Sequence, residues 1–262
     1  MMGLLFHQLA TVAYLLAALL AVLRVILRKD SLGRAAVFAL GAGVLLHTGG
    51  FWKLHTFDPM PSMNSLPMAL SFMAWVGALV YLGLLFWVRG QGLILVVAPA
   101  AFLGCVSGLL SLYAPQPTET LHPVWSHLHV LLSSAGLATL GVAAGAGLLY
   151  IGHHRAIKRK RRVVRTLPPL ESLDRVNTVG LGVGFLLLTF GLFTGMLWVY
   201  ATEGRFWEAS LHANATLGAW VLCGAATLAR FGFNVGARPV AFLSAAGFAL
   251  LVFAVVGAGA FS

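Results

Sequence analysis

Eight long apolar runs occupy most of this chain, and they constrain its fold more than any other feature. A helix that spans a bilayer needs roughly 20 apolar residues, and each run is close to that length. The expected helices are Leu4–Leu27, Ala35–Trp52, Leu66–Val88, Gly92–Tyr113, Trp125–Ile151, Val176–Tyr200, Leu211–Phe231 and Val240–Phe261. The sequence therefore predicts an all-α integral membrane protein with eight transmembrane helices, which form a single polytopic membrane domain over residues 1–262.

The basic residues fall in alternate gaps between these runs. Of the 17 Lys and Arg residues, only Lys53 and Arg205 lie in the other set of gaps. Because positive charge is retained on the cytoplasmic side during insertion, the basic gaps are assigned to the cytoplasm and both termini to the outer side. The orientation in the lipid bilayer therefore accounts for the net charge of +10. We expect no nucleic-acid partner.

The densest basic stretch is His153–Arg165. One interpretation is a retention signal that also attracts anionic lipid headgroups, and the other is a docking site for a protein partner. The first apolar run has no Lys or Arg before Arg24. It therefore lacks the basic start of a cleaved signal peptide, and we expect it to remain as a helix.

Several function classes are disfavoured by residues that the sequence lacks. Cys105 and Cys223 stand singly in apolar runs, without a Cys-x-x-Cys or Cys-x-x-Cys-His pattern, so the chain alone supports neither thiol exchange nor covalent heme attachment. No acidic residue lies in the middle of a run, which disfavours ion-coupled transport. Glycine pairs spaced by four, such as Gly180 with Gly184 and Gly191 with Gly195, predict close helix contacts. No residue is indicated as catalytic.

Histidine is concentrated on the predicted outer side. Seven of the nine histidines lie there, namely His7, His47, His55, His122, His127, His129 and His212. His47 stands six residues before Lys53, which places it about 9 Å along a helix from the outer end. An imidazole at that depth needs a partner, which could be a backbone carbonyl, a facing helix or a metal such as heme iron.

His127 and His129 are two residues apart, so on a helix they point about 200° from each other. They cannot both face one site, and His129 is the deeper and better candidate. His212 begins the seventh run, just after Arg205 and Trp207. These two residues suit a heme propionate and a porphyrin face, and they equally suit the interfacial belt of an ordinary membrane protein.

Short motifs in this order resemble the CcsA and HemX type of cytochrome c assembly protein. The stretch His47–Gly50 is similar to the family's His-Thr motif, and Pro61, Asn64 and Ser71–Trp75 are similar to its next block. His129–Leu132 looks like the outer histidine that precedes a tryptophan-rich loop. The resemblance implies about eight spans that carry heme to the outer face, with this histidine as an axial ligand of the iron.

The sequence also departs from that family. The signature Trp-Gly-x-x-Trp-x-Trp-Asp stands here as Glu203–Ser210, in which only Gly204 and Trp207 remain. The following run lacks the family's membrane histidine, and the sequence ends at Ser262 before a second outer histidine loop. These departures favour the shorter HemX-like branch over a complete heme-export subunit.

The resemblance implies a protein of the bacterial cytoplasmic membrane that binds b-type heme non-covalently near its outer face, within a larger complex of cytochrome c assembly proteins. The expected iron ligands are His47 and His129, with His212 as an alternative, and the expected outer contacts are Arg205 and Trp207. A heme-free regulator of heme biosynthesis, docking through the basic stretch, is the main alternative. A b-type electron carrier ranks last, because the predicted inner half has no histidine within a span.

Overall fold

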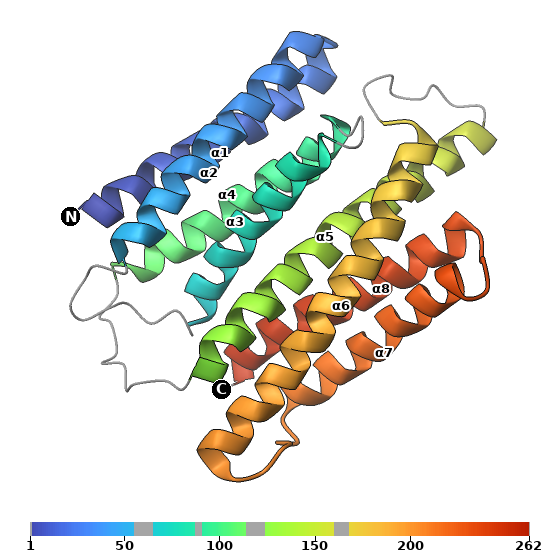
Figure 1. The fold of residues 1–262 in the computed structure, drawn as a ribbon. Coiled ribbons are helices and arrows are strands. Elements are labelled where there is room, and N and C mark those ends of the chain that lie inside the picture. The colour runs from blue at the N-terminus through green and yellow to red at the C-terminus, as the bar shows by residue number, and fades with distance from the viewer. Residues whose placement is uncertain (1, 55–64, 87–90, 114–123, 160–167, 262) are drawn as a thin grey trace. The chain divides into compact units, whose positions relative to one another are not determined.

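The structure is a computed structural model that describes residues 2–54, 65–86, 91–113, 124–159 and 168–261. All regular structure in these ranges is helical (Figure 1). A single 3₁₀ turn, η1 (Gln91–Leu93), precedes α4. The α-helices are α1 (Met2–Leu27), α2 (Asp30–Leu54), α3 (Leu66–Leu84), α4 (Ile94–Ser111), α5 (Val124–Lys158), α6 (Leu170–Glu203), α7 (Leu211–Phe231) and α8 (Ala237–Phe261).

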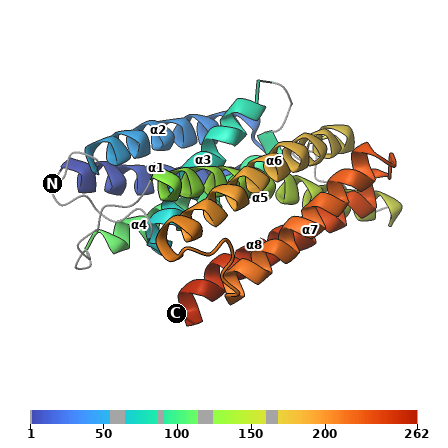
Figure 2. The same cartoon turned by 60° about the horizontal axis from the view of Figure 1, so that its bottom comes forward.

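Seven of these helices, all except α7, are long and apolar enough to cross a bilayer. Large apolar side chains such as Phe38 and Leu45 face outward, at 78% and 75% exposure, as expected for a surface that contacts lipid. Helix α7 has 21 residues but carries His212 and Asn214 near its start. It runs alongside α8 (Figure 1, Figure 2), and its predicted crossing of the membrane stays a prediction. The predicted all-α membrane fold is confirmed.

Several helices extend beyond the apolar runs. Helix α5 continues seven residues past Ile151 to Lys158, and α6 begins at Leu170, six residues before Val176. Arg155 and Lys158 on α5, and Glu171 and Arg175 on α6, are good helix formers in water. The apolar runs therefore located these two helices but not their ends.

The chain forms two compact units. Unit 1 comprises residues 1–120 and 164–168, and contains α1 to α4; unit 2 comprises residues 121–163 and 169–262, and contains α5 to α8. In unit 1, α1 packs against α2 and α4, and α3 packs against α4. The chain reverses between α1 and α2 at Arg28, whose φ is 54°. The predicted single membrane domain stays a prediction.

Unit 2 is built around the contact between α5 and α6. A Cβ atom added at Gly184 would lie 2.7 Å from Cγ of Leu140, and one at Gly191 would lie 2.6 Å from Oγ of Ser133. The same added atoms would lie 3.1 Å and 3.0 Å from the backbone nitrogens of Leu140 and Ser133, so the absence of a side chain at these glycines lets the two helices approach closely. The helix contacts predicted from the glycine pairs on α6 are confirmed.

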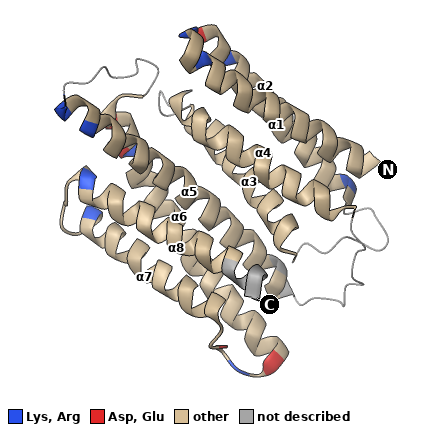
Figure 3. Cartoon of the chain, turned by 180° about the vertical axis from the view of Figure 1, so that it is seen from behind, with Lys and Arg blue, Asp and Glu red and all other residues tan. Residues whose placement is uncertain are grey.

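Basic residues gather at one end of each unit. In unit 1 they lie at the junction of α1 and α2, and in unit 2 they lie at the junction of α7 and α8 and at the end of α5 (Figure 3). This arrangement agrees with the charge pattern that predicted the cytoplasmic side. The outer placement of both termini follows from that pattern and stays a prediction.

Candidate functional site

His129 lies in the second turn of α5 and faces α6. Its Nδ1 atom is 2.8 Å from the carbonyl oxygen of Gly191 and 3.3 Å from Oγ of Ser133. A carbonyl oxygen can only accept a hydrogen bond, so Nδ1 carries the proton of the neutral ring. A Cβ atom at Gly195 would lie 2.8 Å from the same Nδ1 atom. The imidazole therefore occupies space that the glycine leaves open.

This arrangement leaves Nε2 of His129 with its lone pair. Among the described residues, none forms a hydrogen bond with Nε2. Histidines that bind metals commonly donate the N–H of their other nitrogen to a backbone carbonyl, which fixes the tautomer and the ring orientation. The ring of Trp198 lies beside His129, with centroids 5.8 Å apart. The Nε2 atom of His129 thus keeps a lone pair, and the ring is held in place by the Gly191 carbonyl and Trp198.

His212, the second residue of α7, is held in the same way. Its Nδ1 atom is 3.1 Å from the carbonyl oxygen of Ala254 on α8, so Nδ1 donates and Nε2 keeps its lone pair. Unit 2 therefore holds two histidines in the same tautomer.

The segment between α6 and α7 is fixed at both ends. Gly204 adopts φ of 71° and its N–H donates to the carbonyl of Tyr200, which ends α6. The Phe206 ring stacks on Tyr200, with centroids 4.3 Å apart. At the other end, Oγ of Ser210 accepts a hydrogen bond from the N–H of Ala213 and caps α7. The left-handed conformation at position 204 explains why a glycine stands there.

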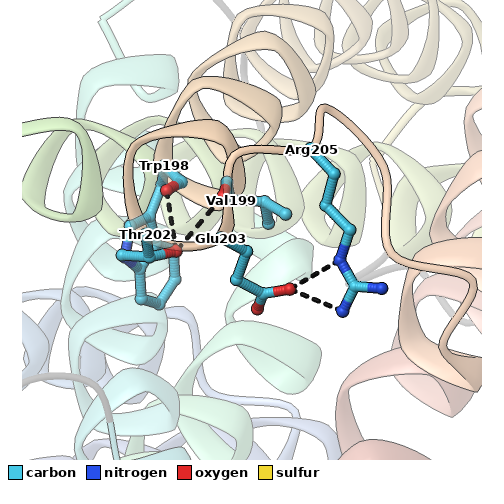
Figure 4. A network of polar contacts seen from close by, with 5 residues as sticks. All are labelled: Trp198, Val199, Thr202, Glu203 and Arg205. Atoms are coloured by element: carbon cyan, nitrogen blue, oxygen red, sulfur yellow. Dashed lines mark hydrogen bonds and ion pairs between the residues drawn. The ribbon is translucent and has the colours of Figure 1, made fainter.

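Arg205 in this segment pairs with Glu203 (Figure 4). Its Nε and Nη2 atoms lie 2.7 Å and 2.6 Å from Oε2 of Glu203, and the hydrogen bond and charge of Glu203 raise the pKa of Arg205 above its usual value. The neighbouring Thr202 hydroxyl donates back to the carbonyls of Trp198 and Val199. Arg205 is exposed and Trp207 is half-buried, so the cation remains open to a ligand anion.

His47 lies in unit 1, and both of its ring nitrogens have partners. Nδ1 is 3.3 Å from the hydroxyl oxygen of Tyr14, and Nε2 is 3.0 Å from Oγ of Ser71. The ring is completely buried and stacks on Phe51, with centroids 4.6 Å apart. The sequence analysis expected a backbone carbonyl, a facing helix or a metal as the partner of this histidine. The structure shows side chains of facing helices, Tyr14 of α1 and Ser71 of α3. The two predicted donors, His47 and His129, belong to different units.

His7 is a buried residue to which the sequence analysis gave no role. Its ring is completely buried and lies 4.9 Å from that of His47. Nδ1 is 3.2 Å from the carbonyl oxygen of Gly3, while Nε2 has no hydrogen-bond partner in the described part of the chain. The sequence did contain a signal for a buried polar face: His7, Thr11 and Tyr14 are spaced by four and three residues, which places them on one face of a helix.

The described residues contain no group of three or more His, Cys, Asp or Glu side chains that could hold a bare metal ion. Heme needs only one or two axial donors from the protein, because the porphyrin supplies four. The side chain of His127 and the residues His55 and His122 lie outside what the structure describes. Cys105 and Cys223 are buried and free, as expected for packing residues.

Comparison with known proteins finds a matching family and several similar sequences. The family described as "Cytochrome C assembly protein" matches residues 63–260. An uncharacterised 28.8 kDa protein of Azospirillum brasilense is 32% identical over 136 residues, covering 51% of this chain and 50% of that protein. The cytochrome c biogenesis protein CcsA of Guillardia theta is 26% identical over 181 residues, covering 60% and 59%. CcsA of Synechocystis sp. is 26% identical over 176 residues, covering 67% and 49%.

Among solved structures, the cytochrome c heme lyase CcmF has a similar fold. The TM-score is 0.68 at 18% identity, and the match covers 99% of this chain and 49% of that protein. The chain thus spans about half the length of the relatives that it matches. The family match begins at residue 63, so α1 and α2, which carry His7 and His47, precede it.

Proposed function

Because this chain belongs to the cytochrome c assembly protein family, with residues 63–260 matched, we propose that unit 2 binds heme non-covalently at its outer end. The observation that carries the proposal is the hydrogen bond from Nδ1 of His129 to the carbonyl of Gly191. It fixes the tautomer in which Nε2 can donate to iron. His212, held to Ala254 in the same tautomer, is the second donor.

Each residue of the site has a separate task. His129 and His212 provide imidazole nitrogens and hold them in orientation through main-chain carbonyls. Arg205 would pair with a propionate, and Trp207 would pack against the porphyrin. When bound, heme supplies an iron that accepts axial nitrogen donors and whose redox potential depends on those donors. The other predicted donor, His47, lies in unit 1, and to bind iron there it would have to give up its contact with Ser71.

We further propose that the protein works within a larger cytochrome c assembly complex of the bacterial cytoplasmic membrane. Two of the relatives are named as cytochrome c biogenesis proteins, and this chain spans 59% and 49% of their lengths. The residues support binding and orientation of a heme, and none of them is assigned a bond-forming step. The partners would be other membrane proteins of that system.

A heme-free, HemX-like regulator is the alternative function. The segment between α6 and α7 retains only Gly204 and Trp207 of the tryptophan-rich signature, which favours a protein that no longer presents heme. Helix α5 extends to Lys158 and exposes Arg155 and Lys158, which would suit docking of a cytoplasmic partner.

An absorption spectrum of the purified full chain, with and without added heme, tests the proposal. Heme bound through two imidazoles gives a low-spin Soret band that saturates at one heme per chain. A chain that never acquires this band, although it is folded and helical by circular dichroism, would contradict heme binding and support the regulatory alternative.

A further inference from the structure

One face of α6 borders the ring of His129. Four residues of α6 share this face, because they are spaced by three, one and three positions along the helix. They are Gly191, Thr194, Gly195 and Trp198. His129 meets this face at three of them, through a carbonyl, the space left by a missing side chain and an aromatic ring. The fourth, Thr194, forms a hydrogen bond with the carbonyl that holds His129.

The hydroxyl of Thr194 has two acceptors on its own helix. Its Oγ1 atom is 2.9 Å from the carbonyl oxygen of Phe190 and 3.0 Å from the carbonyl oxygen of Gly191. A hydroxyl carries one proton, and the two distances are nearly equal. The Thr194 proton is therefore shared between the two carbonyls, and part of its hydrogen bonding goes to Gly191.

The carbonyl oxygen of Gly191 is a shared acceptor. It lies 2.8 Å from Nδ1 of His129 and 3.0 Å from Oγ1 of Thr194. Inside an α-helix, such a carbonyl also accepts the main-chain N–H four residues later. A carbonyl oxygen has two lone pairs, so three donors compete for them. A hydrogen bond from Thr194 to this oxygen therefore weakens the one from His129.

Ser133 on α5 offers the same N–H a second acceptor. Its Oγ atom is 3.3 Å from Nδ1 of His129, whereas the Gly191 carbonyl is 2.8 Å away. Hydrogen bonds from N–H to oxygen usually span about 2.7–3.2 Å, so Gly191 is the main acceptor and Ser133 the weaker one. Competition at the Gly191 carbonyl thus acts on the bond that fixes the His129 ring.

We propose that Thr194 is a positioning residue that lowers the donor strength of His129 by competing for the Gly191 carbonyl. A histidine that donates its Nδ1–H to a strong acceptor becomes a more basic ligand at Nε2. Thr194 takes up part of that acceptor, so it makes Nε2 of His129 less basic. The effect on a ligand rests on the proposed function, whereas the competition at the carbonyl belongs to the heme-free chain.

Proton-detected NMR of the heme-free full chain, with isotope-labelled histidine, tests the competition. The Nδ1–H resonance of His129 is assigned by its loss in His129→Ala. Thr194→Val removes the hydroxyl and keeps the branched shape, so the resonance should move downfield as the remaining hydrogen bond strengthens. Thr202→Val is the matched control, because its Oγ1 lies 3.0 Å and 3.3 Å from the carbonyls of Trp198 and Val199. It should leave the resonance in place.

Two further variants separate the hydroxyl from the shape of the side chain and from the other acceptor. Thr194→Ser keeps a hydroxyl and should give the wild-type resonance, even if Thr194→Val does not fold. Ser133→Ala removes the weaker acceptor and should move the resonance less than Thr194→Val does. An unmoved resonance in Thr194→Val, an equal shift in Thr202→Val, or a larger shift in Ser133→Ala would overturn the proposal.

The midpoint potential of the heme-loaded chain measures the consequence for a ligand. A more basic imidazole stabilises ferric iron over ferrous iron, so Thr194→Val should lower the potential and Thr202→Val should not. An unchanged potential in Thr194→Val would overturn the effect on donor strength. A chain that takes up no heme would contradict the proposed function, and the NMR shift would then still decide whether Thr194 competes for the Gly191 carbonyl.

Discussion

The predicted iron ligands of the two units are held in different ways, while His7 of unit 1, which was not predicted as a ligand, is bound through Nδ1 alone. In unit 2, His129 and His212 are each fixed through Nδ1 to a main-chain carbonyl, at 2.8 Å and 3.1 Å. In unit 1, His47 is fixed at both nitrogens by hydroxyl groups of Tyr14 and Ser71. A ring bound at one nitrogen keeps a donor atom for a ligand, whereas a ring bound at both does not.

Burial follows the same division. His47 is completely buried and stacked against Phe51, while His129 and His212 are partly exposed at the start of their helices. A porphyrin needs an open face beside its ligand, which a completely enclosed ring does not offer. The comparison teaches that a candidate ligand needs both a ring nitrogen without a partner and an open face, because the buried His7 has the first and lacks the second.

The largest expected effect comes from removing the donor in unit 2. His129→Ala should abolish the low-spin Soret band of the heme-loaded protein or convert it to a high-spin band, because the iron loses an axial imidazole. His127→Ala removes an imidazole two residues away, which the helical period predicts to point away from His129, and should change the spectrum much less. Equal losses in both variants, or an unchanged band in His129→Ala, would remove His129 from the site.

Removing His47 should affect stability and not the spectrum. His47→Ala empties a buried position and leaves Tyr14 and Ser71 without their partner. Large-to-small changes in a packed interior cost about 2–5 kcal/mol, so the melting temperature in detergent should fall by several degrees while the Soret band per folded protein stays normal. The reverse result, a lost band in a protein of normal stability, would make His47 the donor.

Gly195→Ala tests whether the contact between α5 and α6 positions the ligand. The added Cβ atom would lie 2.8 Å from Nδ1 of His129 and would displace the ring from the Gly191 carbonyl. Loss of such an orienting contact should weaken heme binding roughly tenfold, as measured by heme titration. Gly152→Ala on α5 is the matched control, because nothing lies within 4 Å of its added Cβ atom. Similar affinity in both variants would show that Gly195 serves helix packing alone.

Much of the fold could be predicted because lipid imposes a strong constraint on sequence. Apolar runs of about 20 residues gave all eight helices, and the glycine pairs on α6 gave the contact with α5. Helix ends were missed, as at Lys158, because the hydrophobic pattern stops where the bilayer stops while the helix continues. The boundary of the membrane and the boundary of the helix are different physical quantities.

The candidate site was less predictable. Periodicity predicts that His129 and His127 point apart, and this stays a prediction because the side chain of His127 lies outside what the structure describes. Periodicity could not show that His47 meets Tyr14 and Ser71, which come from α1 and α3, or that Nδ1 of His129 meets a carbonyl of α6. The partner of each ring nitrogen depends on how helices far apart in sequence pack together. That packing could not be predicted from one sequence.

The smallest expected effect concerns the segment between α6 and α7. It tests whether the heme site proposed in unit 2 includes Arg205. Arg205→Gln should weaken heme binding by about two- to fivefold, since an exposed charge pair contributes little. Glu203→Gln should strengthen binding slightly, because it frees the guanidinium that Glu203 now holds. Since Glu203 raises the pKa of Arg205, the cation stays charged, and the effect of Arg205→Gln should not change between pH 6 and pH 8. Weaker binding in both variants would show that the pair shapes the segment and that Arg205 does not contact a propionate.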